Sequence, residues 1–382
     1  MKTFKFNDEV RERVEKILEI GYLCDYCLGR QFKKISTQKS NKERGRMIRK
    51  VFSIPNENKI CVLCENFFEN LPEISKKIIS KLKKIEFRTF LLGVRLTDSI
   101  VMTEEMFWEK IENEHKESVK SDIHEALRNL IIKKLKRKYE EKKPEITIIF
   151  DKGKNDIEIS ISPLYIYGEY KKYTRGLPQT YSKYHRESVQ GIIAKPIMKI
   201  AKGSLNVFHA MGREDKEARC LAWRPFVIEI KNPLKRNLNL AKIQREVNKN
   251  KKVKIRKLRY SNKEELIKIK IAKPFKIYRL IVEFEKPINN IENVYKIIGT
   301  IKQRTPFRFI DVKEDRVRYK KVKNIKWKRI NNKKYQFEIT AESGIYIKEL
   351  ITGDDGRTTP SIAEVLGCQT FIKEFDLIGL EV

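Results

Sequence analysis

Two short cysteine pairs constrain the fold of the first part of this chain more than any other feature. Cys24 and Cys27 enclose two residues, and Cys61 and Cys64 repeat that spacing further along the chain. Each CxxC hairpin presents two thiolates at one apex, and four soft sulfur ligands suit a tetrahedral zinc ion without an open coordination position. We expect a structural zinc site here. The alternative is four ordinary buried or surface cysteines, which two matched pairs make the less favoured interpretation.

The charge of the chain points to a polyanionic partner. Its 382 residues carry a formal net charge of +33, an excess that repels itself in a folded protein unless a polyanion relieves it. Nucleic acid is the expected partner, and an anionic membrane surface is the rival. No apolar run approaches the roughly 20 residues of a spanning helix, and residues 1–6 lack a signal-like stretch, so we expect a cytoplasmic protein without a membrane partner. The length predicts two domains with room for a small satellite module.

The N-terminal half alternates helical and strand patterns, which predicts an α+β fold. A basic run over 133–143 is either a solvated helix face or an RNA contact. The expected elements are an amphipathic helix over 6–20, a basic helix over 37–51, a strand over 87–94, a long helix over 103–142 with a candidate break near Glu114, and paired strands over 146–150 and 157–161.

The C-terminal half predicts an antiparallel or mixed sheet with helices on one side. It contains no glycine-rich phosphate loop, which disfavours nucleotide-dependent chemistry, and the four histidines form no convincing triad. The expected elements are strands over 225–230, 268–272, 278–284 and 316–322, a terminal strand, and a helix over 238–253.

Two stretches of this half combine charges in ways that suit RNA chemistry. Residues 170–180 interleave aromatic rings and cations, which can stack bases and hold phosphates, although a strand with lysines on its solvated face has the same pattern. Residues 209–219 place the acidic pair Glu214 and Asp215 between arginines after a glycine, which predicts a tight loop.

Five C-terminal strings, in their order and spacing, resemble the archaeal and eukaryotic tRNA pseudouridine synthases that act on the T-loop, the tenth family of these enzymes. The four-cysteine pattern also fits, and the family carries a THUMP-like RNA-binding fold where the match is weak, between 70 and 160. The strings are YTRGLPQT at 173–180, GRED at 212–215, RPF at 224–226, QRTP at 303–306, and the segment 344–361.

The resemblance implies three domains. They are a four-cysteine zinc module with helices over 1–70, a THUMP-like accessory RNA-binding domain over 71–165, and a catalytic domain over 166–382. The last is expected to have a mostly antiparallel mixed sheet flanked by helices.

The resemblance also implies the catalytic residues. Asp215 matches the aspartate of the Gly-Arg-Glu-Asp loop, Tyr278 the tyrosine of a Lys-x-Tyr-Arg string, and Lys348 the basic residue of a Gly-x-Tyr-Ile-Lys string. The chain departs from the family pattern at Glu217, where relatives usually have aspartate, and over 310–313, which replaces a His-Arg-Arg-like string.

The resemblance implies a reaction without an organic or nucleotide cofactor, and the zinc expected at the four cysteines is structural. An ionised Asp215 would assist cleavage of the glycosidic bond by nucleophilic attack or proton abstraction, and Lys348 would keep it charged. Tyr278 would stack on the flipped base and relay its proton. The expected partner is the T-arm of tRNA, at positions 54 and 55 or one of them. Cations expected to contact RNA are Lys172, Arg175, Arg213, Arg304, Arg308 and Arg357.

Other interpretations stay open from the residues alone. Asp215 also fits a structural carboxylate paired with Arg213 or Arg219, because buried ion pairs perturb charged groups in the same way. The charge and the cysteines equally fit a non-catalytic zinc-containing tRNA- or RNA-binding protein. A THUMP-containing methyltransferase is disfavoured, because no glycine-rich cofactor loop follows an early strand in the C-terminal half.

Overall fold

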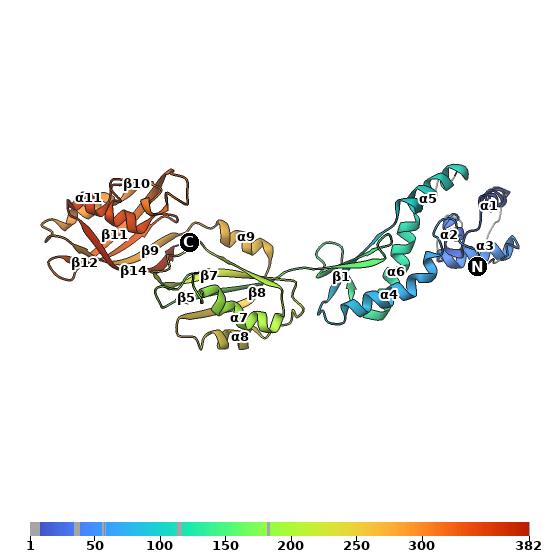
Figure 1. Cartoon of the computed structure of the whole chain (residues 1–382), viewed down its shortest axis with the longest axis horizontal. Helices are drawn as coiled ribbons and strands as arrows, with labels where there is room; N and C mark the ends of the chain where they lie inside the picture. Colours follow the sequence, from blue (N-terminus) through green and yellow to red (C-terminus); the bar gives the residue numbers. More distant parts are fainter. Residues whose placement is uncertain are drawn as a thin grey trace. The chain divides into compact units, whose positions relative to one another are not determined.

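The protein is described from a computed structural model that covers residues 8–33, 39–55, 57, 59–112, 117–181 and 184–381. The chain forms two compact units, Met1–Ser162 and Pro163–Val382, which are described separately. Figure 1 shows the elements of both units. Within the described ranges, no helix is long and apolar enough to cross a membrane.

The first unit begins with helices. The expected helix over 6–20 is confirmed from Asp8 onward, and residues 6 and 7 lie outside the described ranges. The basic helix begins at Asn41, after Ser40 and Glu43 form a capping box, and the start expected at 37 also lies outside those ranges. The helices are α1 (Asp8–Ile20), α2 (Asp25–Arg30), α3 (Asn41–Val51), α4 (Phe67–Leu82), α5 (Asp98–Lys110) and α6 (Val119–Leu135).

The helix expected over 103–142 is not continuous and does not extend to 142. The structure has α5 and α6 in its place, and the expected break near Glu114 falls on residues that are not described. Helix α6 ends because Lys136 takes a left-handed conformation with φ of 52°. The next residues form the edge strand β2 (Lys138–Tyr139), so the basic run over 133–143 is not one helix face.

A four-stranded sheet completes this unit, in the order β2-β1-β3-β4. Strand β1 (Thr89–Arg95) is parallel to β2 and β3 (Ile146–Asp151), and β4 (Asp156–Ile161) pairs antiparallel with β3, which confirms the expected strand pair. One hydrophobic core extends from Val10 to Ile157 and includes Cys27. Because the two expected N-terminal domains share this core, their division at residue 70 stays a prediction.

The second unit is built on a ten-stranded sheet in the order β13-β10-β11-β12-β9-β14-β7-β5-β8, with β6 paired to β7. Every pairing is antiparallel except that of β14 with β7, so the mostly antiparallel mixed sheet is confirmed. The strands are β5 (Leu164–Lys172), β6 (Leu205–Ala210), β7 (Arg219–Lys231), β8 (Val253–Ser261), β9 (Phe275–Phe284), β10 (Gly299–Arg304), β11 (Val317–Arg329), β12 (Lys334–Ala341), β13 (Thr358–Thr359) and β14 (Thr370–Glu381).

Helices flank both faces of β7, not one face as expected. Phe226 and Ile228 pack in the core that includes residues of α7 and α8, whereas Val227 between them packs with α9. Alternate residues of a strand point to opposite faces, so α9 covers the other face. The helices are α7 (Val189–Ala201), α8 (Leu240–Val247), α9 (Lys263–Ile271), α10 (Ile347–Thr352) and α11 (Ile362–Leu366), with the 3-10 helices η2 (Ile291–Ile297) and η3 (Phe307–Phe309).

Three expected elements of this unit need correction. Residues 268–272 were expected to form a strand and lie mostly in α9, whose N-terminus is capped when the Asn262 side chain accepts a hydrogen bond from the amide of Glu265. The helix expected over 238–253 is only α8, and the strand expected over 225–230 is part of the longer β7.

Candidate active site and metal site

The tight loop expected over 209–219 joins β6 to β7 and carries Asp215. Lys172, at the end of β5, supports this loop from inside the protein. Its Nζ donates to the carbonyl oxygens of Leu177 at 3.0 Å, Asp215 at 3.2 Å and Lys216 at 3.1 Å. The Lys172 side chain is fully buried. The expected contact between Lys172 and RNA therefore does not fit its position.

The Asp215 carboxylate lies among donors. Its Oδ2 is 2.9 Å from Nζ of Lys348 and 3.6 Å from Nη1 of Arg308, and its Oδ1 accepts the amide of Glu217 at 2.9 Å. Burial alone would raise the pKa of Asp215, but the Glu217 amide and Lys348 outweigh that effect, so the pKa lies below its ordinary value. Arg219 pairs with Asp376 at 2.6 Å and not with Asp215.

Asp215, Tyr278 and Lys348 lie around one cavity of about 570 Å³. Strand β9 supplies Tyr278, where burial raises the phenol pKa to about 12. Helix α10 supplies Lys348, whose ammonium also lies over the ring of Phe375 at 4.9 Å. The three residues expected to be catalytic therefore come together from three separate elements.

This cavity is also lined by charged groups that were not assigned a role from the sequence. Glu214 and Arg224 form a buried ion pair. The same carboxylate accepts the Tyr170 hydroxyl at 2.6 Å and the Gln179 amide at 2.8 Å. Lys276, two residues before Tyr278 on β9, lines the cavity and is only 6% exposed. Both Glu214, directly before Asp215, and Lys276, in the Lys-x-Tyr-Arg string, stand in motifs that were visible in the sequence. Neither motif indicates that the side chain is buried.

The arginines expected to contact RNA differ in their surroundings. Arg175 donates to the carbonyl of Phe375 at 2.6 Å and pairs with Asp376, so much of it is used inside the protein. Arg308 is bonded to Glu349 at 2.7 Å beside Asp215. Arg304 and Arg357 share Asp315, but the Arg304 side chain is 51% exposed and that of Arg357 only 17%. Arg213 is exposed without an ion pair to any described residue.

The four cysteines of the first unit converge. Their sulfur atoms all lie within 4.8 Å of one another, and those of Cys24 and Cys64 are 3.6 Å apart. Sulfurs at about 2.3 Å from a tetrahedral zinc ion are separated by about 3.8 Å, so the cluster has the right size for one metal ion. The amide of Val62 donates to the carbonyl of Tyr22, which joins the two cysteine hairpins.

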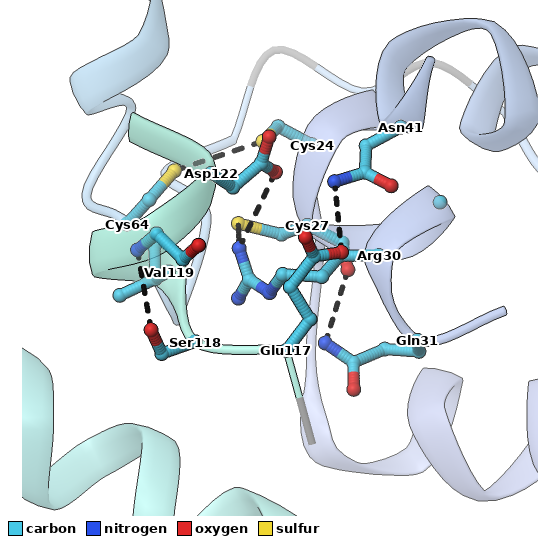
Figure 2. Close-up of polar contacts among 12 residues, drawn as sticks. Cys24, Cys27, Arg30, Gln31, Asn41, Cys64, Glu117, Ser118, Val119 and Asp122 are labelled. Carbon is cyan, nitrogen blue, oxygen red and sulfur yellow. Dashed lines mark hydrogen bonds and ion pairs between the residues drawn. The ribbon is translucent and has the colours of Figure 1, made fainter. Parts of the chain in front are cut away.

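A buried arginine connects the cysteine cluster to two later helices. Figure 2 shows the guanidinium of Arg30 pointing toward Cys27 and Asp122, with Nη1 at 3.7 Å from each. Its Nη2 donates to Glu104 of α5 at 2.9 Å, and Glu104 also accepts the amide of Val119 at the start of α6. The cysteine cluster and the α5–α6 pair therefore share one charged, buried network.

Comparison with known proteins gives a consistent assignment. The family model "Pus10, C-terminal" matches residues 165–381, and "Pus10 THUMP domain, archaeal" matches residues 74–151. A tRNA pseudouridine synthase Pus10 from Pyrococcus furiosus is 35% identical over 97% of both chains. Another from Thermofilum pendens is 32% identical over 97% of this chain and 95% of its own.

One solved structure, a Cbf5-Nop10-Gar1 complex, is similar at a TM-score of 0.32 and 17% identity, over 56% of this chain and 48% of that one. A similarity at that level is too distant to place individual residues. The family models and the full-length relatives lead to one conclusion: this chain belongs to the Pus10 family of tRNA pseudouridine synthases.

Proposed function

We propose that this protein isomerises uridine to pseudouridine in the T-loop of tRNA, at positions 54 and 55 or one of them, without an organic cofactor. The observation that carries the proposal is the ion pair between Asp215 and Lys348 at the cavity that Tyr278 lines. A carboxylate that is ionised, half-buried and held by two cations suits a group that must act as an anion near neutral pH. The similarity to tRNA pseudouridine synthases supports tRNA as the substrate.

The reaction breaks the bond between C1′ of the ribose and N1 of uracil and forms a bond between C1′ and C5. We propose that Asp215 assists the first step, either by attack on C1′ or by taking a ribose proton. The bonding electrons leave with the uracil ring, which turns and then bonds through C5. The proton displaced from C5 is balanced by the proton gained at N1, so no oxidant, reductant or nucleotide is consumed.

Tyr278 is proposed to stack on the extruded base and to pass on the C5 proton. Its phenol keeps its own proton at physiological pH, because its pKa is raised to about 12. A uridine must leave its stack to enter the cavity, which costs a few kcal/mol and is easiest in a loop. A T-loop nucleotide is therefore a natural substrate.

The net charge of +33 supplies electrostatic affinity for RNA that does not depend on the RNA sequence. Among the arginines, Arg213, Arg304 and Arg357 are the proposed direct contacts with RNA. Arg308 is assigned a place between Asp215 and the incoming nucleotide, and Arg175, whose side chain is 30% exposed, keeps a partial role in RNA contact. Lys172 is proposed to support the Asp215 loop and not to contact RNA.

In the first unit we propose that Cys24, Cys27, Cys61 and Cys64 hold a structural zinc ion. Four sulfur donors leave no open coordination position, so the metal would stabilise the fold and take no part in the chemistry. We keep the division into a zinc module over 1–70, a THUMP-like domain over 71–165 and a catalytic domain over 166–382. All six cysteines are free of disulfides, which suits a reducing cytoplasm.

The test uses an unmodified tRNA transcript, purified protein and no added cofactor, with pseudouridine mapped at single-nucleotide resolution. Wild type should modify the T-loop, and Asp215→Asn should bind the transcript but modify nothing. Asp156→Asn, which removes an exposed carboxylate paired with Lys81 in the first unit, is the matched control and should behave as wild type. Tight binding with no pseudouridine from several tRNAs would instead establish a non-catalytic zinc-containing tRNA-binding protein.

A further inference from the structure

Lys276 is an unusual residue for the interior of a protein. It is 6% exposed, and its Nζ forms no hydrogen bond or ion pair within the described part of the chain. Beside it, Arg224 is fully buried and its Nη2 has no partner, although its Nη1 binds Glu214. Glu214 Oε1 is also unpartnered. Glu214 and Arg224 are thus only partly satisfied, and the Lys276 ammonium has no partner among the described residues; unsatisfied buried polar atoms and charges cost free energy, so this cluster needs a reason other than stability.

The three groups lie together at one place in the site. A methyl group on Gly212 would lie 3.3 Å from Arg224 Nη2 and 3.4 Å from Lys276 Nζ, so both donors approach the backbone at this glycine. Lys276 and Tyr278 are two residues apart on β9 and therefore face the same side of the sheet. All of these side chains line the cavity beside Asp215. The Lys276 side chain therefore lines the space that the proposed function assigns to the extruded uracil.

We propose that Lys276 is a catalytic residue that donates to a carbonyl oxygen of the extruded uracil and stabilises the negative charge that the base acquires when its bond to C1′ breaks. This inference rests on the proposed function and deepens it. The electron pair of the broken bond spreads over the ring nitrogen and the two carbonyl oxygens. A preorganised cation in a desolvated cavity stabilises such charge far better than water does. The proton stays on Lys276 throughout, so the balance of the reaction is unchanged.

The charged groups that face Lys276 set the pH at which it works. Arg224 and Cys220 approach from β7 and Glu214 from the loop, while its strand neighbours on β12 and β14 are the apolar Ala341 and Leu380. Burial first, and then the repulsion of Arg224, lower the pKa of Lys276 to about 8. The ammonium is therefore present at neutral pH and lost as the pH rises through that value.

The experiment compares single-turnover rate constants for pseudouridine formation, tRNA dissociation constants and melting temperatures. Lys276→Met keeps the length and removes the charge, and should lower the rate constant about 10²–10³-fold, as loss of one charge-stabilising donor does. Its tRNA affinity should be unchanged, and its melting temperature should be equal to or above that of wild type, because a buried unpaired cation is removed. Lys373→Met, which removes an exposed lysine paired with Glu283, is the matched control and should leave all three quantities unchanged.

A second variant keeps the inference testable if Lys276→Met fails to fold. Lys276→Arg retains the charge at every pH used, since guanidinium groups stay protonated. Wild type should lose rate above pH 8, by up to tenfold per pH unit, while Lys276→Arg should keep a flat profile up to pH 9. A loss that appears equally in both profiles comes from the RNA and overturns the assignment to Lys276.

Two other results would overturn the inference. The first is a Lys276→Met enzyme that is as fast as wild type. The second is a Lys276→Met enzyme whose lower rate comes with a lower melting temperature, while wild type and Lys276→Arg have the same pH profile. An inactive wild type would instead refute the proposed function itself, so the two failures are distinguishable.

Discussion

Replacing Lys172 with methionine separates two roles that the sequence alone leaves open for this residue. The ammonium of Lys172 donates to the backbone carbonyls of Leu177, Asp215 and Lys216. Within the described residues, only the Asp215 carbonyl accepts a second hydrogen bond, from the amide of Ala218. The variant leaves the carbonyls of Leu177 and Lys216 without a partner, at about 1–3 kcal/mol each. We therefore expect the second unit to lose about 2–6 kcal/mol of stability.

The assay is native-state hydrogen exchange of the buried amides of β7, which reports the free energy of unfolding of that unit in the full-length protein. Lys171→Met is the matched control. It removes the neighbouring lysine, which lies over the ring of Trp223 at 4.9 Å, and should cost no more than about 1 kcal/mol.

The same variant tests contact with RNA. A lysine that binds a phosphate contributes about one unit to the slope of log affinity against log salt concentration. Because Lys172 is fully buried, its replacement should leave this slope unchanged at temperatures where the protein is folded. A normal stability together with a slope reduced by one unit would refute the structural role and restore Lys172 as an RNA contact.

Three further predictions concern the charged networks of both units. Arg30→Met leaves Glu104 and Asp122 buried without their cation and should destabilise the first unit by about 3–5 kcal/mol in denaturant titrations, whereas a loss under 1 kcal/mol would contradict the network. Cys64→Ser should reduce bound zinc below one equivalent in metal analysis and make the melting of the first unit insensitive to a chelator; full retention of zinc would exclude this ligand set. The pKa of Asp215 lies below the ordinary aspartate value of 3.8, so its charge and the stability from its pair with Lys348 persist until the pH falls below 3.8. The single-turnover rate constant should therefore not fall between pH 7 and pH 5 through protonation of Asp215.

Much of the architecture was predictable because local patterns determine it. The two CxxC spacings predicted a cluster that the structure confirms, and the loop that carries Asp215 follows from its glycine and its dense charges. The strand error over 268–272 has a clear cause. Isoleucines at 267, 269 and 271 alternate with lysines as in a strand, but only Ile269 is buried, with Leu266 three residues before it. The Asn262 cap was the overlooked signal.

The interior of the site was not predictable in the same way. Lysine is among the residues least often buried, so a sequence pattern assigns Lys172 and Lys276 to the surface by default. Their burial results from the pairing of β5 with β7 and of β9 with β12 and β14, which joins segments far apart in the chain. Arg30 is a similar case, because its partners lie more than 70 residues away.

The parallel pairing of β14 with β7 has a consequence for how the active site forms. In it, Asp376 pairs with Arg219 and Leu377 pairs with Cys220, and the members of each pair are 157 positions apart in the sequence. Arg219 and Cys220 lie at the start of β7, directly after the Asp215 loop. Closing so large a loop costs chain entropy before any contact compensates for it, and such long-range pairings slow folding. The loop that holds Asp215 is therefore expected to become ordered among the last parts of its unit, so that partly folded molecules would bind RNA through their charge without reacting with it.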